Sequence, residues 1–309
     1  MPKVSIVIPT YNVGPWIEET LKSVARQTFR DFECIVVDDG SIDDTQYIVS
    51  EFCKKDSRFQ LKINRNNIGV SNVRNMGMNM ASGEYISFLD GDDLWHSEFI
   101  ESMLNIINKK QAWVAYSRFA LFKDGTNIRK PLIWDNLLRT KNIWWDMLMI
   151  TEFCTCSWLG RLDVVRSIGG FNPHLRVGED RDFLLRLLES ICFKHCEKVS
   201  GTDRELFFYR QREGSAVRNA REALDTEWEM MREHIEHIGV PLRIRRRAWS
   251  FLAFKMAVIA GFGVKDISTA LRWYSKAIYY DIFNVNIYWL PLVKIYNELF
   301  IKKGGIKFS

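Results

Sequence analysis

The residues best suited to chemistry in this sequence are three carboxylates within four positions, Asp90, Asp92 and Asp93. They directly follow the apolar run Tyr85–Leu89, whose short length and aromatic and β-branched residues predict a buried strand. Carboxylates are not stable in apolar surroundings without a partner, and clusters of them bind oxygen-preferring divalent cations, typically beside a phosphate. The alternative is an Asp-Gly turn followed by the cap of a helix over Leu94–Lys110. The cluster by itself does not choose between a cation site and a turn.

Polar residues also follow the other strands predicted in the first part of the chain. Apolar runs predict these strands at Val4–Ile8, Phe32–Val37, Phe59–Ile63 and Trp113–Ser117. Helical patterns with short connections lie between them, and this alternation favours a parallel sheet. Ligands bind where the carboxyl ends of such strands meet. Because Thr10, Asp39, Arg74 and the acidic cluster all come to that edge, the sequence favours a binding site over unrelated turns.

The rest of the first 215 residues follows a less regular pattern. A capping box formed by Ser41 and Asp44 is expected to start the second helix, and Asp124-Gly125 is expected to form a hairpin turn. The segment Pro131–Ile150 is rich in Trp and Leu, which fits either a helix or a lid. Later elements are predicted as a strand at Phe153–Trp158, a short helix at Val164–Ile168, a helix opened by Gly178–Asp182 and a strand at Glu205–Tyr209.

Composition is that of a globular protein with 47% hydrophobic and 26% charged residues, which argues against disorder. The sequence goes straight into a strand pattern after one Lys, without the pattern of a signal peptide. None of the six cysteines forms a Cys-x-x-Cys pair, so they are expected to be free thiols in a reducing cytosol. These observations predict a cytoplasmic location.

Charge is divided unevenly along the chain. Residues Gly239–Ser309 hold twelve Lys and Arg but three acids, a net charge of +9, which leaves −4 for the first 238 residues of a chain with net charge +5. The acidic part fits a catalytic domain that uses a metal, and the basic part predicts an anionic partner. Because helical patterns begin near Asn219, we expect two domains, residues 1–218 and an all-helical extension at 219–309.

Two partners fit the basic helical extension. The stretch Ala248–Val264 is shorter than the about 20 clean apolar residues that a spanning helix needs. Basic residues mixed with Trp and Tyr suit helices that lie in the interface of an anionic membrane, which would place the protein peripherally on its inner face. The alternative is a helical bundle that packs on the catalytic domain or forms a homo-oligomer. Nucleic acid is not expected as a partner, because no recognition fold is visible.

Six motifs in order resemble those of glycosyltransferase family 2. They are Val4–Asn12, Val36–Thr45, Asn67–Gly77, Phe88–Asp93, Gly169–Phe171 and Glu179–Phe183. Each motif is weak alone, but their order is specific, and the resemblance covers about Lys3 to Ser215. It implies a GT-A nucleotide-binding fold of the α/β class, with a mostly parallel central sheet flanked by helices. It further implies a nucleotide-sugar donor, usually a UDP-sugar, a bound Mn²⁺ or Mg²⁺, and inversion at the anomeric carbon.

The resemblance also implies roles for individual residues. The residues implied in metal binding are Asp92 and Asp93. Those implied in nucleotide binding are Pro9, Thr10, Tyr11, Asp39, Asn67, Arg74 and Asp90. The family has Asp-x-Asp at this position, and Asp93 adds a third carboxylate. The resemblance therefore leaves open which of the three acids contact the ribose and which contact the metal. Asp180 falls on the position of the catalytic base. Contacts to the acceptor or diphosphate are expected from Trp158, Glu179 and Arg210.

Simpler interpretations exist for several of these residues. Asp180 could be one of several acids that stabilise the first turn of a helix, and Asp39 could belong to a turn that caps the next helix. Trp158 could be a core residue, Arg74 a surface helix residue and Arg210 part of a solvated face.

The function predicted is a metal-dependent inverting glycosyltransferase, which uses a glycan or lipid-linked acceptor in the synthesis of cell-surface polysaccharide. The alternative is a catalytically inactive GT-A domain that binds a nucleotide sugar. A nucleotidyltransferase is disfavoured, because no Gly-rich phosphate loop with a Lys follows the first strand.

Overall fold

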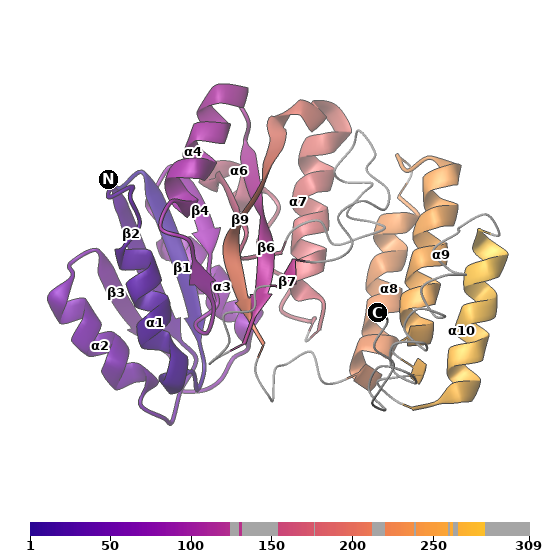
Figure 1. Ribbon diagram of the computed structural model, residues 1–309, viewed down its shortest axis with the longest axis horizontal. Helices are drawn as coiled ribbons and strands as arrows, with labels where there is room; N and C mark the ends of the chain where they lie inside the picture. Colours follow the sequence, from indigo (N-terminus) through magenta and orange to yellow (C-terminus); the bar gives the residue numbers. More distant parts are fainter. Residues whose placement is uncertain are drawn as a thin grey trace, which may run out of the picture. The chain divides into compact units, whose positions relative to one another are not determined.

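The computed structural model describes residues 1–123, 130–131, 154–175, 177–211, 220–237, 239–258, 260–261 and 265–281. The chain divides into two compact units, Met1–Met147 with Thr151–Ser215, and Leu148–Ile150 with Ala216–Ser309 (Figure 1). The domain boundary at residue 218 stays a prediction, because residues 212–219 lie outside the described ranges.

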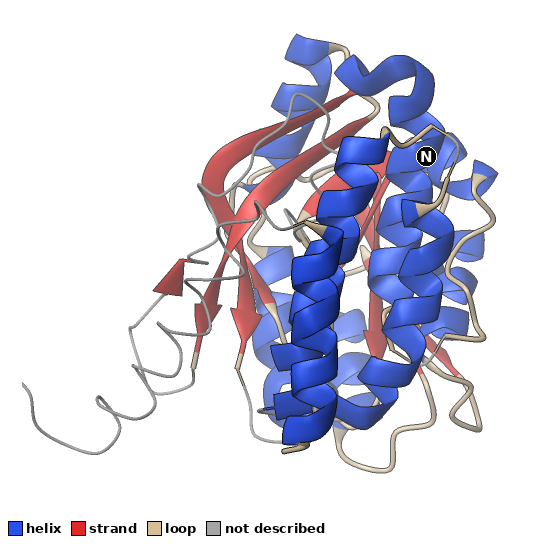
Figure 2. Ribbon diagram, turned by 90° about the vertical axis from the view of Figure 1, so that its right-hand side faces the viewer, coloured by secondary structure: helices blue, strands red, loops and turns tan. Residues whose placement is uncertain are grey.

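A mixed sheet forms the centre of the first unit, and its strands are the red arrows of Figure 2. In the described residues its order is β3-β2-β1-β4-β8-β6-β9-β5, and β7 pairs with β6. The strands are β1 Val4–Thr10, β2 Phe32–Asp38, β3 Phe59–Ile63, β4 Tyr85–Phe88, β5 Leu94–Trp95, β6 Val114–Phe122, β7 Lys130–Pro131, β8 Trp158–Arg161 and β9 Val199–Arg210. The predicted GT-A-type α/β class is confirmed. The parallel part is β3-β2-β1-β4, and the strands beyond it pair in both directions.

Helices of the first unit connect and flank these strands. They are α1 Gly14–Ala25, α2 Thr45–Lys55, α3 Val70–Met80, α4 Phe99–Lys110, α6 Leu162–Ser167 and α7 Glu179–His195, followed by the 3-10 turn η2 Cys196–Lys198. These helices confirm three predictions: a helix after the asparagines that precede Gly69, a short helix at Val164–Ile168 and a helix after Gly178. Helix α3 lies very close to β1, since a Cβ atom on Gly77 would come 2.3 Å from Cγ1 of Val7. This close packing fixes the helix that carries Arg74 against the central strand.

Two local predictions are wrong. The predicted capping box is absent, because the hydroxyl of Ser41 donates to Asp38 and helix α2 begins only at Thr45, whose backbone N–H donates to Asp43. A strand was predicted at Phe153–Trp158, but the observed strand β8 begins only at Trp158. Residues 154–157 form a turn instead, in which the Ser157 hydroxyl accepts from the backbone N–H of residue 154 and donates to its carbonyl.

Strands β5 and β9 were incompletely predicted. A helix beginning at Leu94 belonged to the alternative interpretation of the acidic cluster as a turn, but Leu94–Trp95 pairs with β9 as a short antiparallel strand and helix α4 begins at Phe99. Strand β9 is longer than the predicted Glu205–Tyr209, because it pairs in parallel with β6 from Val199 to Arg210. This pairing brings the end of β9 beside the acidic loop, residues Asp90–Asp93. The Asp124-Gly125 turn, Pro131–Ile150 beyond its first residue, and residues 282–309 of the predicted helical extension lie outside the described residues.

The second unit contains three described helices, α8 Ala220–Ile235, α9 Leu242–Val258 and α10 Ile267–Tyr280. Trp228 of α8 contacts both Trp249 of α9 and Trp273 of α10, with ring centroids 4.5 Å apart in each pair. The hydroxyl of Ser250 donates to the carbonyl of Ala277 over 2.9 Å. Aromatic side chains therefore hold these three helices together.

The basic run of α9 is not uniformly available to a partner. Arg245 donates to the carbonyls of His237 and Val240, and Arg247 lies 3.7 Å from Asp281. The side chains of Arg243 and Arg246 are exposed. In the part of the chain that the structure describes, no helix has the length and hydropathy needed to cross a bilayer.

Replacing Trp249 or Phe254 by alanine is expected to lower the free energy of unfolding of the second unit by about 3–5 kcal/mol, because both side chains are buried in its core. Urea unfolding of the full chain, followed by tryptophan fluorescence for the Phe254 variant and by circular dichroism for both, measures the loss. Tyr279→Ala is the matched control, since that side chain is 85% exposed. Equal stability of all three variants would contradict the packing described above.

Candidate active site

The loops that follow β1 and β2 are joined by backbone hydrogen bonds. The register of the sheet places Thr10 beside Asp38, so both strands end at one level. The N–H of Asn12 donates to the Ser41 hydroxyl over 2.9 Å, and the N–H of Asp39 donates to the carbonyl of Thr10 over 2.8 Å. The two loops therefore form one rigid edge.

Two adjacent acids at the end of β2 have different surroundings. The carboxylate of Asp38 is fully buried and accepts from Thr10, Ser41 and Gln46, so it holds the edge together. The carboxylate of Asp39 accepts the backbone N–H groups of residues 68 and 69, each over 2.9 Å. A carboxylate has about four acceptor positions, so Asp39 keeps the capacity to accept from a ligand.

The remaining predicted nucleotide residues of the first three loops lie at the same edge. Pro9 and Thr10 are buried at the end of β1, whereas Tyr11 is 48% exposed and Asn67 is exposed. Gly40 is required between them, because its φ is +77° and a Cβ atom there would come 3.2–3.4 Å from the backbone of residues 65–67. The structure thus gathers all these residues around one edge, as the sequence predicts.

The three acids of the loop after β4 differ in accessibility. The side chain of Asp90 is 34% exposed, Asp92 is half-buried, and Asp93 is 1% exposed. One carboxylate oxygen of Asp93 accepts the backbone N–H of Arg210 over 2.8 Å, and the other has no hydrogen-bond partner among the described residues. Burial, with Asp92 and Asp90 nearby, raises the pKa of Asp93 well above its usual range.

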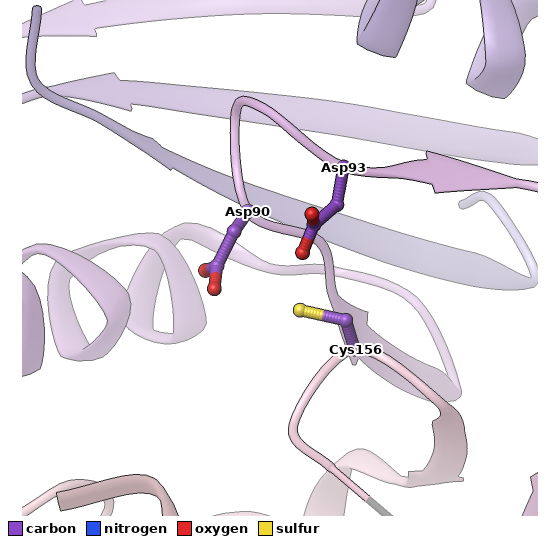
Figure 3. Close-up of side chains that lie close together, drawn as sticks. All are labelled: Asp90, Asp93 and Cys156. Atoms are coloured by element: carbon purple, nitrogen blue, oxygen red, sulfur yellow. The ribbon is translucent and has the colours of Figure 1, made fainter. Parts of the chain in front are cut away.

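Figure 3 shows that the side chains of Asp90, Asp93 and Cys156 lie close together. Potential ligand atoms of the three residues lie within 4.8 Å of one another. The carboxylate oxygens of this loop are the donor type that Mn²⁺ and Mg²⁺ prefer, and the unpartnered oxygen of Asp93 marks unused acceptor capacity. The thiol of Cys156 is a poor ligand for these ions, and burial raises its pKa well above the usual value. The acidic loop therefore fits the expected cation through its carboxylates.

Arg74 connects this loop to helix α7. Its guanidinium donates to Asp90 over 2.8 Å and to Glu179 over 3.1 Å, and the residue is 4% exposed. It also lies 5.1 Å from the ring centroid of Phe171. Burial opposes the charge, but Asp90 and Glu179 outweigh it and raise the pKa of Arg74 above its ordinary value. These contacts do not fit the interpretation of Arg74 as a surface helix residue.

Three acids lie in the first turn of α7, and two of them, Glu179 and Asp180, have different partners. Gly178, with φ +82°, makes the turn into the helix. The side chain of Glu179 is 14% exposed, and burial followed by the charge of Asp180 raises its pKa to about 7. The half-buried Asp180 accepts the backbone N–H of Arg181 over 2.7 Å.

Trp158 and Arg210 are both buried in the described structure. Trp158 has no exposed surface and stacks on Phe183, with ring centroids 5.8 Å apart. Arg210 donates to the carbonyl of Asp92 and pairs with Glu19, each over 2.6 Å. These surroundings fit the alternative of a core role for Trp158 and indicate that Arg210 anchors the acidic loop to β9 rather than belonging to a solvated face.

The sequence also contains positioning residues that motif reading did not single out. Asn75 makes two hydrogen bonds to the backbone of Phe171, of 2.8 and 2.7 Å. A Cβ atom on Gly170 would come 2.4 Å from the Asn75 side chain, and Gly170 has φ +81°. These contacts hold the motif Asn67–Gly77 against the motif Gly169–Phe171 in the folded chain. Cys156 was missed as a neighbour of the acids because nothing in its local pattern signals that contact.

Comparison with known proteins identifies the family. The model of the family described as glycosyl transferase family 2 matches residues 5–169, more than half of the chain. The chain therefore belongs to glycosyl transferase family 2, which confirms the class of enzyme predicted from its motifs.

Curated relatives include several bacterial glycosyltransferases. The chain is 33% identical over 224 residues to an uncharacterized glycosyltransferase, EpsJ of Bacillus subtilis, covering 70% of this chain and 63% of EpsJ. It is 28% identical over 260 residues to a putative teichuronic acid biosynthesis glycosyltransferase, TuaG of the same species, covering 82% and 94%. A Campylobacter jejuni β-1,3-glucosyltransferase, named for its undecaprenol-linked substrate, is 38% identical over 126 residues, or 40% of each chain. The chain thus spans less than two thirds of EpsJ.

Solved structures share the fold at low sequence identity. Residues 1–349 of S. aureus TarS in complex with UDP match with a TM-score of 0.65 and 19% identity, covering 99% of this chain and 94% of that one. The mannosyltransferase PcManGT of Pyrobaculum calidifontis, in complex with GDP-Man and Mn²⁺, matches with a TM-score of 0.64 and 16% identity, covering 89% and 75%.

Proposed function

We propose that this chain transfers a sugar from a UDP-sugar to a hydroxyl group of a glycan or lipid-linked acceptor, with inversion at the anomeric carbon and the help of Mn²⁺ or Mg²⁺. The observation that carries the proposal is that Arg74 joins Asp90 of the acidic loop to Glu179 in the first turn of α7, while Asp39 follows the end of β2 in the same sheet. Family membership supports the reaction class, and the geometry supports the division of roles.

Recognition of the base is assigned to the edge formed by the first three loops. A carboxylate at Asp39 would accept the N3–H of uracil, a donor that cytosine lacks at this position. The two backbone N–H groups that it accepts hold it in place for this contact. Tyr11 and Asn67 are exposed beside it and would line the base and ribose. The UDP complex of TarS is consistent with uridine, whereas PcManGT binds a guanosine donor.

The cation and the diphosphate are assigned to the acidic loop. Asp92 and the unpartnered oxygen of Asp93 are the candidate ligands, because Asp90 is paired with Arg74. Asp90 would then face the ribose, and Asp93 would hold the loop through the backbone of Arg210. When bound, the cation supplies Lewis-acid stabilisation of the negative charge on the leaving diphosphate.

Asp180 is assigned as the general base that removes the proton of the acceptor hydroxyl. The neighbouring Glu179 is already bound to Arg74, whereas Asp180 accepts from its own helix backbone alone among the hydrogen bonds described. A carboxylate in hydrogen-bond reach of the attacking hydroxyl contributes typically about 100- to 10,000-fold to the rate. Holding donor and acceptor in line supplies much of the remainder.

Incubating the purified chain with a panel of UDP-sugars and Mn²⁺, and measuring released UDP with and without candidate acceptors, tests the function. We expect UDP release from one donor, faster with acceptor and lost with a chelator. Binding of a UDP-sugar without hydrolysis or transfer to any acceptor would favour a catalytically inactive binding domain instead. The relatives named for teichuronic acid and undecaprenol-linked substrates support a cell-surface glycan or glycolipid as the acceptor to test first.

We also propose that the second unit binds an anionic membrane at the cytoplasmic face through Arg243 and Arg246, the exposed arginines of α9. Each Lys or Arg near such a surface contributes about 1 kcal/mol, and the attraction weakens with salt. Replacing both by Gln should release the chain from vesicles containing acidic lipid, while Arg245→Gln, which removes a capping contact, should lower stability instead. If the fraction of protein that sediments with vesicles depends on neither lipid charge nor salt, this proposal is contradicted. A homo-oligomer is then the alternative.

A further inference from the structure

We propose that Glu179 is a positioning residue that, through Arg74, couples occupation of the donor site to the placement of Asp180. This inference rests on the proposed function, because it takes the acidic loop as the donor site and Asp180 as the base. It gives Glu179 a role other than the contact with acceptor or diphosphate that the sequence predicts.

The bridge joins parts of the chain that are distant in sequence. Arg74 lies on α3, Asp90 lies 16 residues later in the acidic loop, and Glu179 lies 105 residues from Arg74 at the start of α7. The two carboxylates are bound by different terminal nitrogens of one guanidinium, Asp90 by Nη2 and Glu179 by Nη1. A planar guanidinium holds two such partners in fixed directions, which a lysine ammonium would not do.

Burial makes the two halves of the bridge dependent on each other. Arg74 is 4% exposed, and its Nε atom has no hydrogen-bond partner among the described residues. A buried charge that loses one partner is strongly destabilised. When a ribose hydroxyl of the donor engages Asp90, Arg74 depends more on Glu179, and the first turn of α7 is drawn into its catalytic position.

Packing around the bridge gives it a rigid frame. Phe171 lies against Arg74 and stacks on Phe183 of α7, with ring centroids 4.0 Å apart and planes 8° apart. Asn75, the residue after Arg74, holds the backbone of Phe171 through two hydrogen bonds. Helices α3 and α7 are therefore already linked, and Glu179 adds a charged connection from Arg74 to the turn that carries Asp180.

Three variants separate coupling from simple stability. Glu179→Ala removes the bridge, and Glu179→Gln keeps an oxygen that accepts from Arg74 without the charge. Asp182→Asn is the matched control, because it removes a carboxylate from the same turn whose ion pair is with Arg186 of the same helix. For each protein, calorimetry measures UDP affinity with Mn²⁺, and hydrogen–deuterium exchange follows α7 with and without UDP.

For the parent and Asp182→Asn, UDP should slow exchange in the first two turns of α7. In Glu179→Ala this UDP-dependent protection should disappear, UDP affinity should stay within about 3-fold, and kcat should fall about 10- to 100-fold because the base is misplaced. Glu179→Gln should recover part of both effects. Equal UDP-dependent protection of α7 in the parent and in Glu179→Ala would overturn the coupling.

Loss of UDP affinity in step with kcat in Glu179→Ala would also overturn it, and would make Glu179 a donor-binding residue. A parent chain that does not bind UDP at all would show a different result: it would overturn the proposed function itself, and the coupling with it.

Discussion

Replacing Asp180 by Asn is expected to lower kcat by about 100-fold or more, while UDP affinity stays nearly unchanged. A general base acts on the acceptor proton in the transition state, so its loss reduces turnover and not donor binding. The carboxamide is nearly isosteric and can still accept the N–H of Arg181, so the helix turn should survive. Steady-state kinetics with saturating donor, together with calorimetry of UDP, measure the two quantities separately.

The control for this substitution is Asp182→Asn on the same helix, whose carboxylate binds Arg186. It should change kcat by no more than a few-fold once the fraction of folded protein is taken into account. If donor affinity of Asp180→Asn falls in proportion to its rate, Asp180 is a binding or structural residue, and the general base must be sought elsewhere on the first turn of α7.

The second large effect is expected at the acidic loop. Asp92→Asn should abolish transfer and weaken UDP binding chiefly when Mn²⁺ is present, because a neutral amide is a poorer ligand for a hard cation than a carboxylate. The half-buried position of Asp92 allows this ligand role, whereas its carbonyl already accepts from Arg210 and keeps the loop in place in the variant. Titrations of both proteins with UDP, in Mn²⁺ and in chelator, give the comparison.

In chelator the two proteins should bind UDP with similar affinity, which serves as the internal control for a correctly folded nucleotide site. Equal UDP affinity of Asp92→Asn and the parent in Mn²⁺ would remove the metal role from Asp92. The same experiment on Asp93→Asn would then decide whether the buried acid, and not its neighbour, meets the cation.

The sheet edge that we propose as the nucleotide site was predictable from sequence because each part of it is local. Asp39, Asn67 and Asp90 each follow a predicted strand, and in a parallel sheet the carboxyl ends of strands meet at one edge. The observed register, with Thr10 beside Asp38 and Asp38 beside Ile63, places these loops as expected. The alternation of strands and helices was therefore sufficient to predict the class of fold and the location of the nucleotide edge.

The partners of buried side chains were not predictable in the same way. The pairing of Arg74 with Glu179 spans 105 residues, and no pattern in the sequence reports such a contact. Alternating apolar residues before Trp158 predicted a strand, but a serine hydroxyl that binds nearby backbone groups made a turn there instead. Strand propensity and hydrophobic periodicity do not account for a side chain that competes with a strand for the hydrogen-bonding groups of the backbone.

The C-terminal helices show the same limit. Trp249 and Phe254 follow the basic run of α9 and fitted either a membrane face or a bundle core. The structure buries both among the helices of the second unit, which leaves Arg243 and Arg246 as the exposed basic residues of that run. Composition identified a basic aromatic segment, but the choice of which residues meet a partner depends on tertiary packing.

The most direct test of the account is a calorimetric titration of the unmodified chain with UDP, in Mn²⁺ and in chelator, with GDP and ADP as competitors for the base. We predict one UDP site per chain, tighter in Mn²⁺, and lost when Asp39 is replaced by Ala. Two results would contradict the donor site. One is the absence of UDP binding both in Mn²⁺ and in chelator. The other is equal affinity for UDP, GDP and ADP in the parent and in Asp39→Ala.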